Sequence, residues 1–446
     1  MFFAVSGLFI IFIFCLGYPV VNYLCLKDDD SSFTEKFPLI MTTGFLINHL
    51  IFLSLQSLKP ALLAGMILAA GALIMIFRQR KKIFALPAKA LRLPLAMILS
   101  ILLLYYFKIL SDPLDWWDAR SIWFFHAKMI LYAQTISPAA GWHHVSVPHT
   151  DYPKLIPALA AQISYVLGYW NEYAPKLSIF LVLIPPVFWI FSFYTRSFSF
   201  LLLVLVLPLG LKTYLWNGGM DGFVAFYTAV SMLLLGRYFT GRRRIDLLSA
   251  LCCLMLVCNL KNEGILIGLI GFFSIAATEL LSRKDNSKVA EVVFGIKQFI
   301  WLVLILSPCV IWSVLYKHLW HLTNDLKIGT AESFSRMAGR LSDGTSFPYI
   351  IKGAFFHDES AVWLAAITFA AGFILLKSSR RQTVSWIPAL ITAVLYFCGI
   401  VAIYLLTPAG LVWHVLTSVQ RTMLTVTACL IAGAYFILRE LESAKS

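Results

Sequence analysis

The sequence predicts an all-α, polytopic integral membrane protein with about 13 transmembrane helices and further interfacial helices in its first large outer loop. Hydrophobic residues make up 60% of the chain and charged residues 13%, and the mean hydropathy is +0.82. Apolar runs long enough to cross a hydrocarbon core of roughly 30 Å recur from one end to the other. The lysines and arginines lie mostly in short segments between these runs. A separate soluble domain is therefore not expected.

The expected spans follow one another with short connections. They cover roughly residues 2–24, 38–57, 61–77, 92–110, 176–195, 199–216, 222–239, 246–260, 264–281, 296–316, 361–378, 384–405 and 417–438. The first run has no basic start and no small-residue cleavage site, so it is interpreted as a retained span and not as a signal peptide.

Four basic loops set the expected orientation, because cytoplasmic loops carry an excess of Lys and Arg. They are "RQRKK" (78–82), "GRRR" (241–244), "SRKDNSK" (282–288) and "KSSRR" (377–381). With these in the cytoplasm, the polar segments that stand out all fall on the outer face. These are loop 111–153, turn 216–221, turn 261–264, loop 317–360 and turn 407–414.

One apolar segment, "KLIPALAAQISYVLGYW" (154–170), does not fit this alternation as a span. It is the least apolar of the runs, with Gln162, Ser164 and Gly168. We therefore expect it to dip into or lie along the outer interface without crossing. Tyr169 and Trp170 would then sit at headgroup level, where amphipathic rings are favoured.

The cysteines and the net charge exclude two classes of protein. All eight cysteines lie inside apolar runs, so neither a disulfide framework nor a cysteine metal cluster is expected. The net charge of +14 comes largely from loops between spans, which indicates membrane orientation and not nucleic-acid binding.

The segment "DPLDWWDARSIWFFHAKMI" (112–130) gathers three aspartates among three tryptophans directly after a span. Asp112 is interpreted as a solvated turn residue before Pro113, and Asp115 either as a helix N-cap or as a functional acid. Asp118 lies inside the expected helix on an apolar face. It either pairs with Arg120 or Lys128 or takes part in chemistry.

A second polar motif is "HTDYPKLIP" (149–157). Pro153 favours an extended conformation at Tyr152, so Asp151 is expected on a loop. His149 and Asp151 are either metal ligands or parts of a hydrogen-bonded turn.

Three further charges lie at the ends of expected spans. Asp221 in "NGGMDGFVAFY" suits the first turn of a helix, where the helix dipole favours an acid. In "KNEG", Lys261 and Glu263 stand between two apolar runs with one residue separating them. Charges held that close to the hydrocarbon are functional candidates by default.

The last motif is "TPAGLVWHVLTSVQR", in which His414 and Arg421 are about two helical turns apart and share a face. Arg421 inside a span needs an anionic partner, either a protein acid or a ligand phosphate. Acids beside cations suit a reaction in which a hydroxyl loses a proton while a phosphate leaves.

The order and common sidedness of these motifs resemble the type C glycosyltransferases, which include protein O-mannosyltransferases and lipid A aminoarabinose transferases. The resemblance rests on "DWWDARSIWFFHAKMI", "DYPKLIP", "GGMDGFVAFY", "KNEG" and "WHVLTSVQR" and covers about residues 92–438. It departs from the family in two ways: three spans precede the first large loop, and Lys154 stands where the family has a second proline. Residues 1–90 are therefore interpreted either as an N-terminal addition to a catalytic domain at 91–446 or as an altered part of its core.

The resemblance implies a polyprenyl-phosphate-linked sugar as donor and a lipid-linked, glycan or protein acceptor. Transfer would occur with inversion on the periplasmic or exterior face of a bacterial inner membrane. Asp118 would act as general base, with Asp115 as the fallback. Lys261, Arg421 and His414 would stabilise the leaving phosphate. Asp151, Asp221, Glu263 and His149 would orient the sugar or hold a divalent cation, the one cofactor considered. Loop 317–360 would cover the site and contact the acceptor.

The main alternative is a lipid-linked sugar flippase or a secondary transporter of the cell envelope. Transporters show internal repeats and place polar groups near the midplane at broken helices. The sequence shows no convincing repeat, and its polar motifs gather at one expected face.

Overall fold

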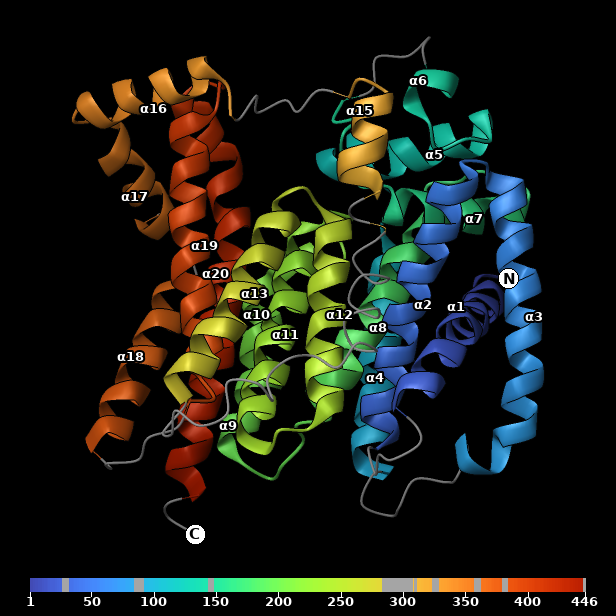
Figure 1. Ribbon diagram of the computed structural model, residues 1–446, viewed down its shortest axis with the longest axis horizontal. Coiled ribbons are helices and arrows are strands. Elements are labelled where there is room, and N and C mark those ends of the chain that lie inside the picture. Colours follow the sequence, from blue (N-terminus) through green and yellow to red (C-terminus); the bar gives the residue numbers. More distant parts are fainter. Residues whose placement is uncertain are drawn as a thin grey trace. The chain divides into compact units, whose positions relative to one another are not determined.

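The computed structural model describes residues 1–25, 32–83, 92–142, 148–282, 308, 311–322, 329–356, 362–378 and 384–443. Within these residues every secondary-structure element is a helix, and one isolated β-bridge joins Ser57 to Thr135 (Figure 1). The all-α prediction is therefore confirmed.

Ten helical segments in the described part of the chain are long and apolar enough to cross a membrane, so the predicted count of thirteen is not confirmed. Two of the other predicted spans are helices of 17 residues, α12 (Arg244–Leu260) and α18 (Val362–Ser378). At 1.5 Å per residue each is about 26 Å long, slightly short of a hydrocarbon core. The predicted span 296–316 lies largely outside the described residues.

The chain divides into two compact units. The first unit contains Met1–Tyr194, Thr213–Gly219 and Phe294–Leu322, and the second contains Thr195–Lys212, Met220–Val293 and Thr323–Ser446. Residues 1–90 share the first unit with the whole of loop 111–153. Whether they were added to an older core stays a prediction.

The first unit is built from six long or apolar helices and several short ones. They are α1 (Phe2–Cys25), α2 (Phe33–Leu55), α3 (Leu58–Ile83), α4 (Arg92–Ser111), the π-helix η2 (Ala119–Trp123), α5 (Phe124–Ala133), α6 (Pro138–Gly141), α7 (Leu155–Leu167), the 3-10 helix η3 (Ala174–Lys176), α8 (Leu177–Phe191), the π-helix η7 (Ile311–Tyr316) and α15 (Lys317–Leu319). Helices α1 and α2 approach closely at Gly17 and Gly44, where a Cβ on either glycine would overlap backbone atoms of the other helix.

Helix α7 corresponds to the segment that was expected not to cross. It has 13 residues, about 20 Å, which is too short to span a bilayer by itself. The segment does not lie on the surface: residues 155–164 are buried inside the first unit, against α2, α5 and α8. Gln162, which lowered its apolar character, forms a reciprocal pair of hydrogen bonds with Asn48 of α2, at 2.9 and 3.0 Å.

The second unit has α11, α12 and α20 at its centre. Its elements are α9 (Phe198–Leu201), the π-helix η4 (Leu202–Val206), α10 (Leu207–Leu211), α11 (Asp221–Gly241), α12, α13 (Glu263–Ser282), α16 (Ala331–Ser342), α17 (Ser346–Phe356), α18, α19 (Ile387–Leu406) and α20 (Leu411–Ser443); the 3-10 helix η5 (Lys212–Leu215) lies at the boundary. Helices α11 and α12 form an antiparallel hairpin, and α20 packs along α11, α18 and α19 (Figure 1).

Candidate functional site

Three of the predicted site residues meet at one end of the α11–α12 hairpin, in the second unit. Asp221 is the first residue of α11, Lys261 follows directly after α12, and Glu263 begins α13. The Lys261 Nζ lies 2.8 Å from Asp221 Oδ1 and 3.1 Å from Glu263 Oε1. The side chains of Lys261 and Asp221 are only 9% and 5% exposed, so this ion pair is largely withdrawn from water.

Arg421 of α20 completes this group, which we call the charge cluster (Asp221, Lys261, Glu263 and Arg421). Its Nη1 lies 3.9 Å from Asp221 Oδ2, an ion-pair distance beyond hydrogen-bonding reach. The formal charges of the four side chains cancel, as a buried set of ions requires. Of the two anionic partners considered for Arg421, the protein acid is the one observed. Its role in binding a phosphate stays a prediction, as does that of Lys261.

The "KNEG" turn owes its tightness to Gly264. A Cβ at this position would overlap the carbonyl group of Val257 in the preceding helix, so glycine lets the two helices approach there. At this close approach, Gly264 at the start of α13 lies against Val257 in the last turn of α12. The glycine of the motif therefore positions Glu263 beside the lysine.

His414 lies on α20 two turns before Arg421, as its spacing predicted. Its ring is 4.8 Å from the ring of Tyr404 in α19. The Tyr404 hydroxyl in turn hydrogen-bonds to Ser418 Oγ at 2.7 Å. This face of α20 therefore packs against α19.

In the first unit, Asp118 stands at the start of a π-helical turn. The Phe124 N–H donates to the Ala119 carbonyl, five residues earlier, so η2 has the wider π spacing. The turn that follows Asp118 is therefore wider than the regular α-helix that the sequence suggested. Asp118 is 9% exposed, whereas Asp115 is exposed and lies before Trp116, whose carbonyl accepts the first helical hydrogen bond from Arg120 N–H. π-Turns occur frequently at functional sites.

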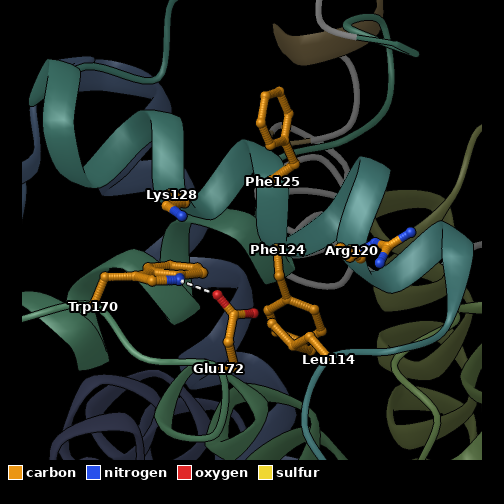
Figure 2. Close-up of a pocket in the computed structure, with 7 residues that line it drawn as sticks. All are labelled: Leu114, Arg120, Phe124, Phe125, Lys128, Trp170 and Glu172. Atoms are coloured by element: carbon orange, nitrogen blue, oxygen red, sulfur yellow. Dashed lines mark hydrogen bonds between the residues drawn. The ribbon is translucent and has the colours of Figure 1, made fainter.

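A half-open cavity of about 360 Å³ borders this segment. It is lined by Leu114, Arg120, Phe124, Phe125, Lys128, Trp170 and Glu172 (Figure 2). Glu172 accepts a hydrogen bond from Trp170 Nε1 at 3.2 Å, and Lys128 Nζ lies 5.9 Å from the centre of the Trp170 ring. The cavity thus combines aromatic walls with two cations and one carboxylate.

The cavity lies where two spans end. Leu114 comes three residues after α4, and Glu172 comes two residues before the span that begins at Ala174. Lys176 Nζ donates to the Asp112 carbonyl at 2.8 Å and so joins these two ends. Asp112 itself pairs with Lys108 at 3.0 Å with both side chains about half exposed, as expected of a solvated turn residue.

Asp151 and His149 occupy a hydrogen-bonded turn. The Tyr152 N–H donates to the His149 carbonyl at 3.0 Å, which is the turn alternative considered for this pair. The Asp151 side chain is buried, with Oδ2 4.0 Å from Lys317 Nζ, and its carbonyl accepts from Trp312 Nε1 at 3.1 Å. Within the described residues no group of three or more His, Cys, Asp or Glu is placed to hold a metal ion.

Sequence reasoning missed the centre of this region, which is Lys154. Its side chain is fully buried, and its Nζ donates to the carbonyls of Thr150 and Tyr152, both at 2.9 Å, and to His126 Nδ1 at 3.2 Å. The ring of Trp312 lies 5.0 Å from the same nitrogen. The one indication of it in the sequence was its position, since Lys154 directly precedes the apolar segment that forms α7. Its partner His126 could not be found from spacing.

The tautomer of His126 follows from these contacts. The Pro148 carbonyl can only accept, so His126 Nε2 carries the hydrogen and donates to it at 2.9 Å, and in the neutral ring Nδ1 accepts from Lys154 Nζ. Burial lowers the pKa of His126 well below its ordinary value, and Lys154 adds to this effect. Burial also lowers the pKa of Lys154 well below its usual range, although Asp151 opposes the shift.

These shifts predict that acid destabilises the first unit. An unfolded histidine takes up a proton below about pH 6.5, whereas folded His126 does not, so stability falls as the pH drops below that value. We expect the purified protein to melt at a lower temperature at pH 5 than at pH 7.5, and His126→Asn to reduce this difference. His318→Asn, an exposed control, should leave it unchanged. A full pH dependence in His126→Asn would contradict the assignment.

Two arginines of loop 317–360 that matched no motif have a structural role. Arg340 Nη1 donates to the carbonyls of Tyr404 and Thr407 at 2.7 and 2.9 Å, and Nη2 to that of Ala409 at 3.0 Å. Arg336 Nε donates to the Leu406 carbonyl at 3.2 Å. They satisfy carbonyls that the end of α19 leaves without helical partners, and cations are favoured there.

We therefore expect Arg340→Met to destabilise the protein by at least about 1.5–3 kcal/mol, the usual contribution of a hydrogen bond to a charged group. Arg336→Met removes one such bond and should reduce the free energy of unfolding by a smaller amount. Melting temperatures of the two purified variants test this order. Equal melting temperatures would show that Arg340 is not the main cap of α19.

No protein-family model, curated protein or solved structure matches this chain. The resemblance to type C glycosyltransferases therefore stays a prediction from the motifs.

Proposed function

We propose that this protein is a membrane glycosyltransferase that moves a sugar from a polyprenyl-phosphate-linked donor to an acceptor hydroxyl at the extracytoplasmic face, with inversion. The observation that carries the proposal is the cavity lined by Arg120 and Lys128, whose segment begins at Asp118 and lies between the end of α4 and the start of the span at Ala174. A lipid-linked donor has its reacting group at this depth. An aromatic cavity with few polar groups is the usual form of a small-molecule site.

The reaction assigns a distinct task to each kind of side chain. The acceptor oxygen forms a bond to the anomeric carbon, the bond from that carbon to the phosphate oxygen breaks, and the hydroxyl proton passes to Asp118. The phosphate leaves with the bonding electron pair, and cations stabilise its charge. Arg120 and Lys128 line the cavity and are candidates for this task in the first unit. The same task for Lys261, Arg421 and His414, which belong to the second unit, stays the prediction from the sequence.

The burial of Asp118 supports its role as the base. Asp118 is 9% exposed, so bulk water competes little for its carboxylate. Asp115 is exposed and lacks this advantage, so it remains the fallback.

The transporter alternative keeps one specific observation in its favour. The span Phe198–Leu215 is broken into α9, η4, α10 and η5, and Lys212 at its break has a positive φ of 50°. Broken helices are typical of transporters. Asp221, Lys261 and Glu263 of the charge cluster, however, lie at the ends of α11, α12 and α13, and Arg421 lies within the continuous helix α20, so none of them is at a break.

The test is an assay of the purified protein in lipid with a panel of polyprenyl-phosphate-linked hexoses and pentoses. Mass spectrometry would follow free polyprenyl phosphate together with glycosylated acceptor lipids and glycans. We expect one donor to be consumed with release of polyprenyl phosphate. Recovery of every donor unchanged would contradict the proposal and favour the transporter.

A further inference from the structure

A short segment between two helices of the second unit forms part of the first unit. It consists of residues 213–219, which we call the strap, and the residues before and after it in the chain belong to the second unit. Two aromatic side chains fasten the strap. Tyr214 lies edge-to-face against Trp116 with ring centres 6.0 Å apart, and the ring of Trp216 lies 6.1 Å from that of Tyr105. The strap therefore packs where α4 ends and the segment of Asp118 begins.

Gly218 brings the strap against the π turn that follows Asp118. A Cβ at Gly218 would lie 2.6 Å from Ala119 Cβ and 3.0 Å from Phe124 Cε2, so only glycine fits without displacing the turn. Ala119 directly follows Asp118 and begins the turn, and Phe124 closes it. Phe124 also lines the cavity (Figure 2). One glycine therefore approaches both ends of the turn.

The shape of the strap is fixed by its own backbone. Gly218 has a φ of 90°, in the left-handed region that side chains other than glycine rarely adopt. Asn217 Oδ1 accepts a hydrogen bond from Gly219 N–H at 2.8 Å, and Asn217 N–H donates to the Thr213 carbonyl at 2.9 Å. These bonds form a compact turn of the kind that asparagine favours. The strap can therefore fix the position of the residues that it touches.

We propose that the strap is a positioning element for Asp118 and that Gly218 is its central positioning residue. Isolated π turns are rare, and the contacts of Gly218 at both ends of this one give a physical reason for it to persist. A general base must stay within hydrogen-bonding reach of the proton that it takes. The role of the strap in the chemistry rests on the proposed function, because it assumes that Asp118 is the base.

The test begins with Gly218→Ala, which adds a Cβ at the contact with Ala119. Gly329→Ala is the matched control, since Gly329 has a φ of 91° and a Cβ there would meet nothing within 4 Å. The double variant Gly218→Ala with Ala119→Gly removes the atom that the new methyl group would meet. Tyr214→Leu removes the ring that packs against Trp116 and serves as a second variant if Gly218→Ala does not fold. Size-exclusion chromatography would show which variants are folded.

Turnover would be measured with the donor that the panel identifies. A misplacement of about 1 Å can lower a rate on the order of 10²-fold, so we expect Gly218→Ala to lower kcat by about tenfold to a hundredfold. The KM for the donor should change little, and the double variant should recover most of the loss. A kcat that is normal in both Gly218→Ala and Tyr214→Leu, or that is equally low in Gly218→Ala and the double variant, would overturn the proposal.

Hydrogen–deuterium exchange tests the contact without turnover. Amides of residues 116–124 should exchange about tenfold faster or more in Gly218→Ala than in the wild type, and slow again in the double variant. Gly329→Ala should leave them unchanged. A wild type that consumes no donor would refute the proposed function, whereas faster exchange would still show that the strap holds the turn. Unchanged exchange in both Gly218→Ala and Tyr214→Leu would overturn the role of the strap, whether or not the protein transfers a sugar.

Discussion

Lys261→Met should reduce the free energy of unfolding by about 3–5 kcal/mol, the usual cost of leaving a buried charge without its partner. Lys261 contacts both acids of the charge cluster, at 2.8 and 3.1 Å. Its removal leaves Asp221 and Glu263 with Arg421, whose Nη1 lies 3.9 Å from Asp221 Oδ2. The cluster would then carry a net negative charge in a site withdrawn from water.

Melting temperature in mild detergent measures this effect. Lys108→Met is the matched control, because Lys108 pairs with Asp112 at 3.0 Å while about half exposed, and exposed pairs contribute about 0–1 kcal/mol. The double variant Lys261→Met with Asp221→Asn restores neutrality and should recover part of the loss. A single variant as stable as the wild type would show that the cluster does not hold the helix ends together.

Asp118→Asn should lower the turnover of the proposed transfer by about 10²–10⁴-fold, the usual contribution of a general base. Asparagine has nearly the same shape but cannot take the hydroxyl proton. Donor binding should persist, because the cavity residues are unchanged. The effect should therefore appear in kcat and not in KM.

Asp115→Asn is the control for this variant, since it removes a neighbouring exposed carboxylate. We expect it to retain activity within about threefold of the wild type, as is usual for a residue that only affects the surrounding charge. A folded Asp118→Asn with nearly normal turnover would exclude Asp118 as base. The search would then move to Asp115 and Asp151.

The sequence was sufficient to predict the helical class and the positions of most spans, because apolar runs of bilayer length are a local property. Helix α12 shows where apolar composition is insufficient. It has 17 residues, and nearly every one of them is buried in protein. Apolar composition alone does not separate a short helix enclosed by neighbours from one that faces lipid. The predicted total differs from the ten segments found in the described residues because α12 and α18 have only 17 residues each and the predicted span 296–316 lies largely outside those residues.

Pairings between distant residues could be anticipated only in part. The alternation of spans placed Asp221 and Lys261 at the same end of a hairpin, and their ion pair agrees with this. Spacing carried no information on the contact of Lys154 with His126, 28 positions apart. That contact depends on how α7 packs against α5, and local patterns do not encode packing.

The type of helix that follows Asp118 could not be predicted from the sequence. The sequence suggested a regular α-helix, but η2 has π spacing, which rotates later side chains relative to earlier ones. The cavity lined by Arg120 and Lys128 was likewise invisible in the sequence, because Trp170 and Glu172 reach it from a segment about 50 residues away. The π turn after Asp118 and the cavity together locate the proposed chemistry in the first unit.

The fate of a labelled sugar in sealed vesicles tests the central claim most directly. The donor that the panel identifies would be supplied with an isotope in its sugar, and the protein would be reconstituted with acceptor lipids. We predict that the label appears in a new glycosidic product as unlabelled polyprenyl phosphate is released. Intact labelled donor on the opposite leaflet, with no new product, would contradict glycosyl transfer and identify the protein as a carrier.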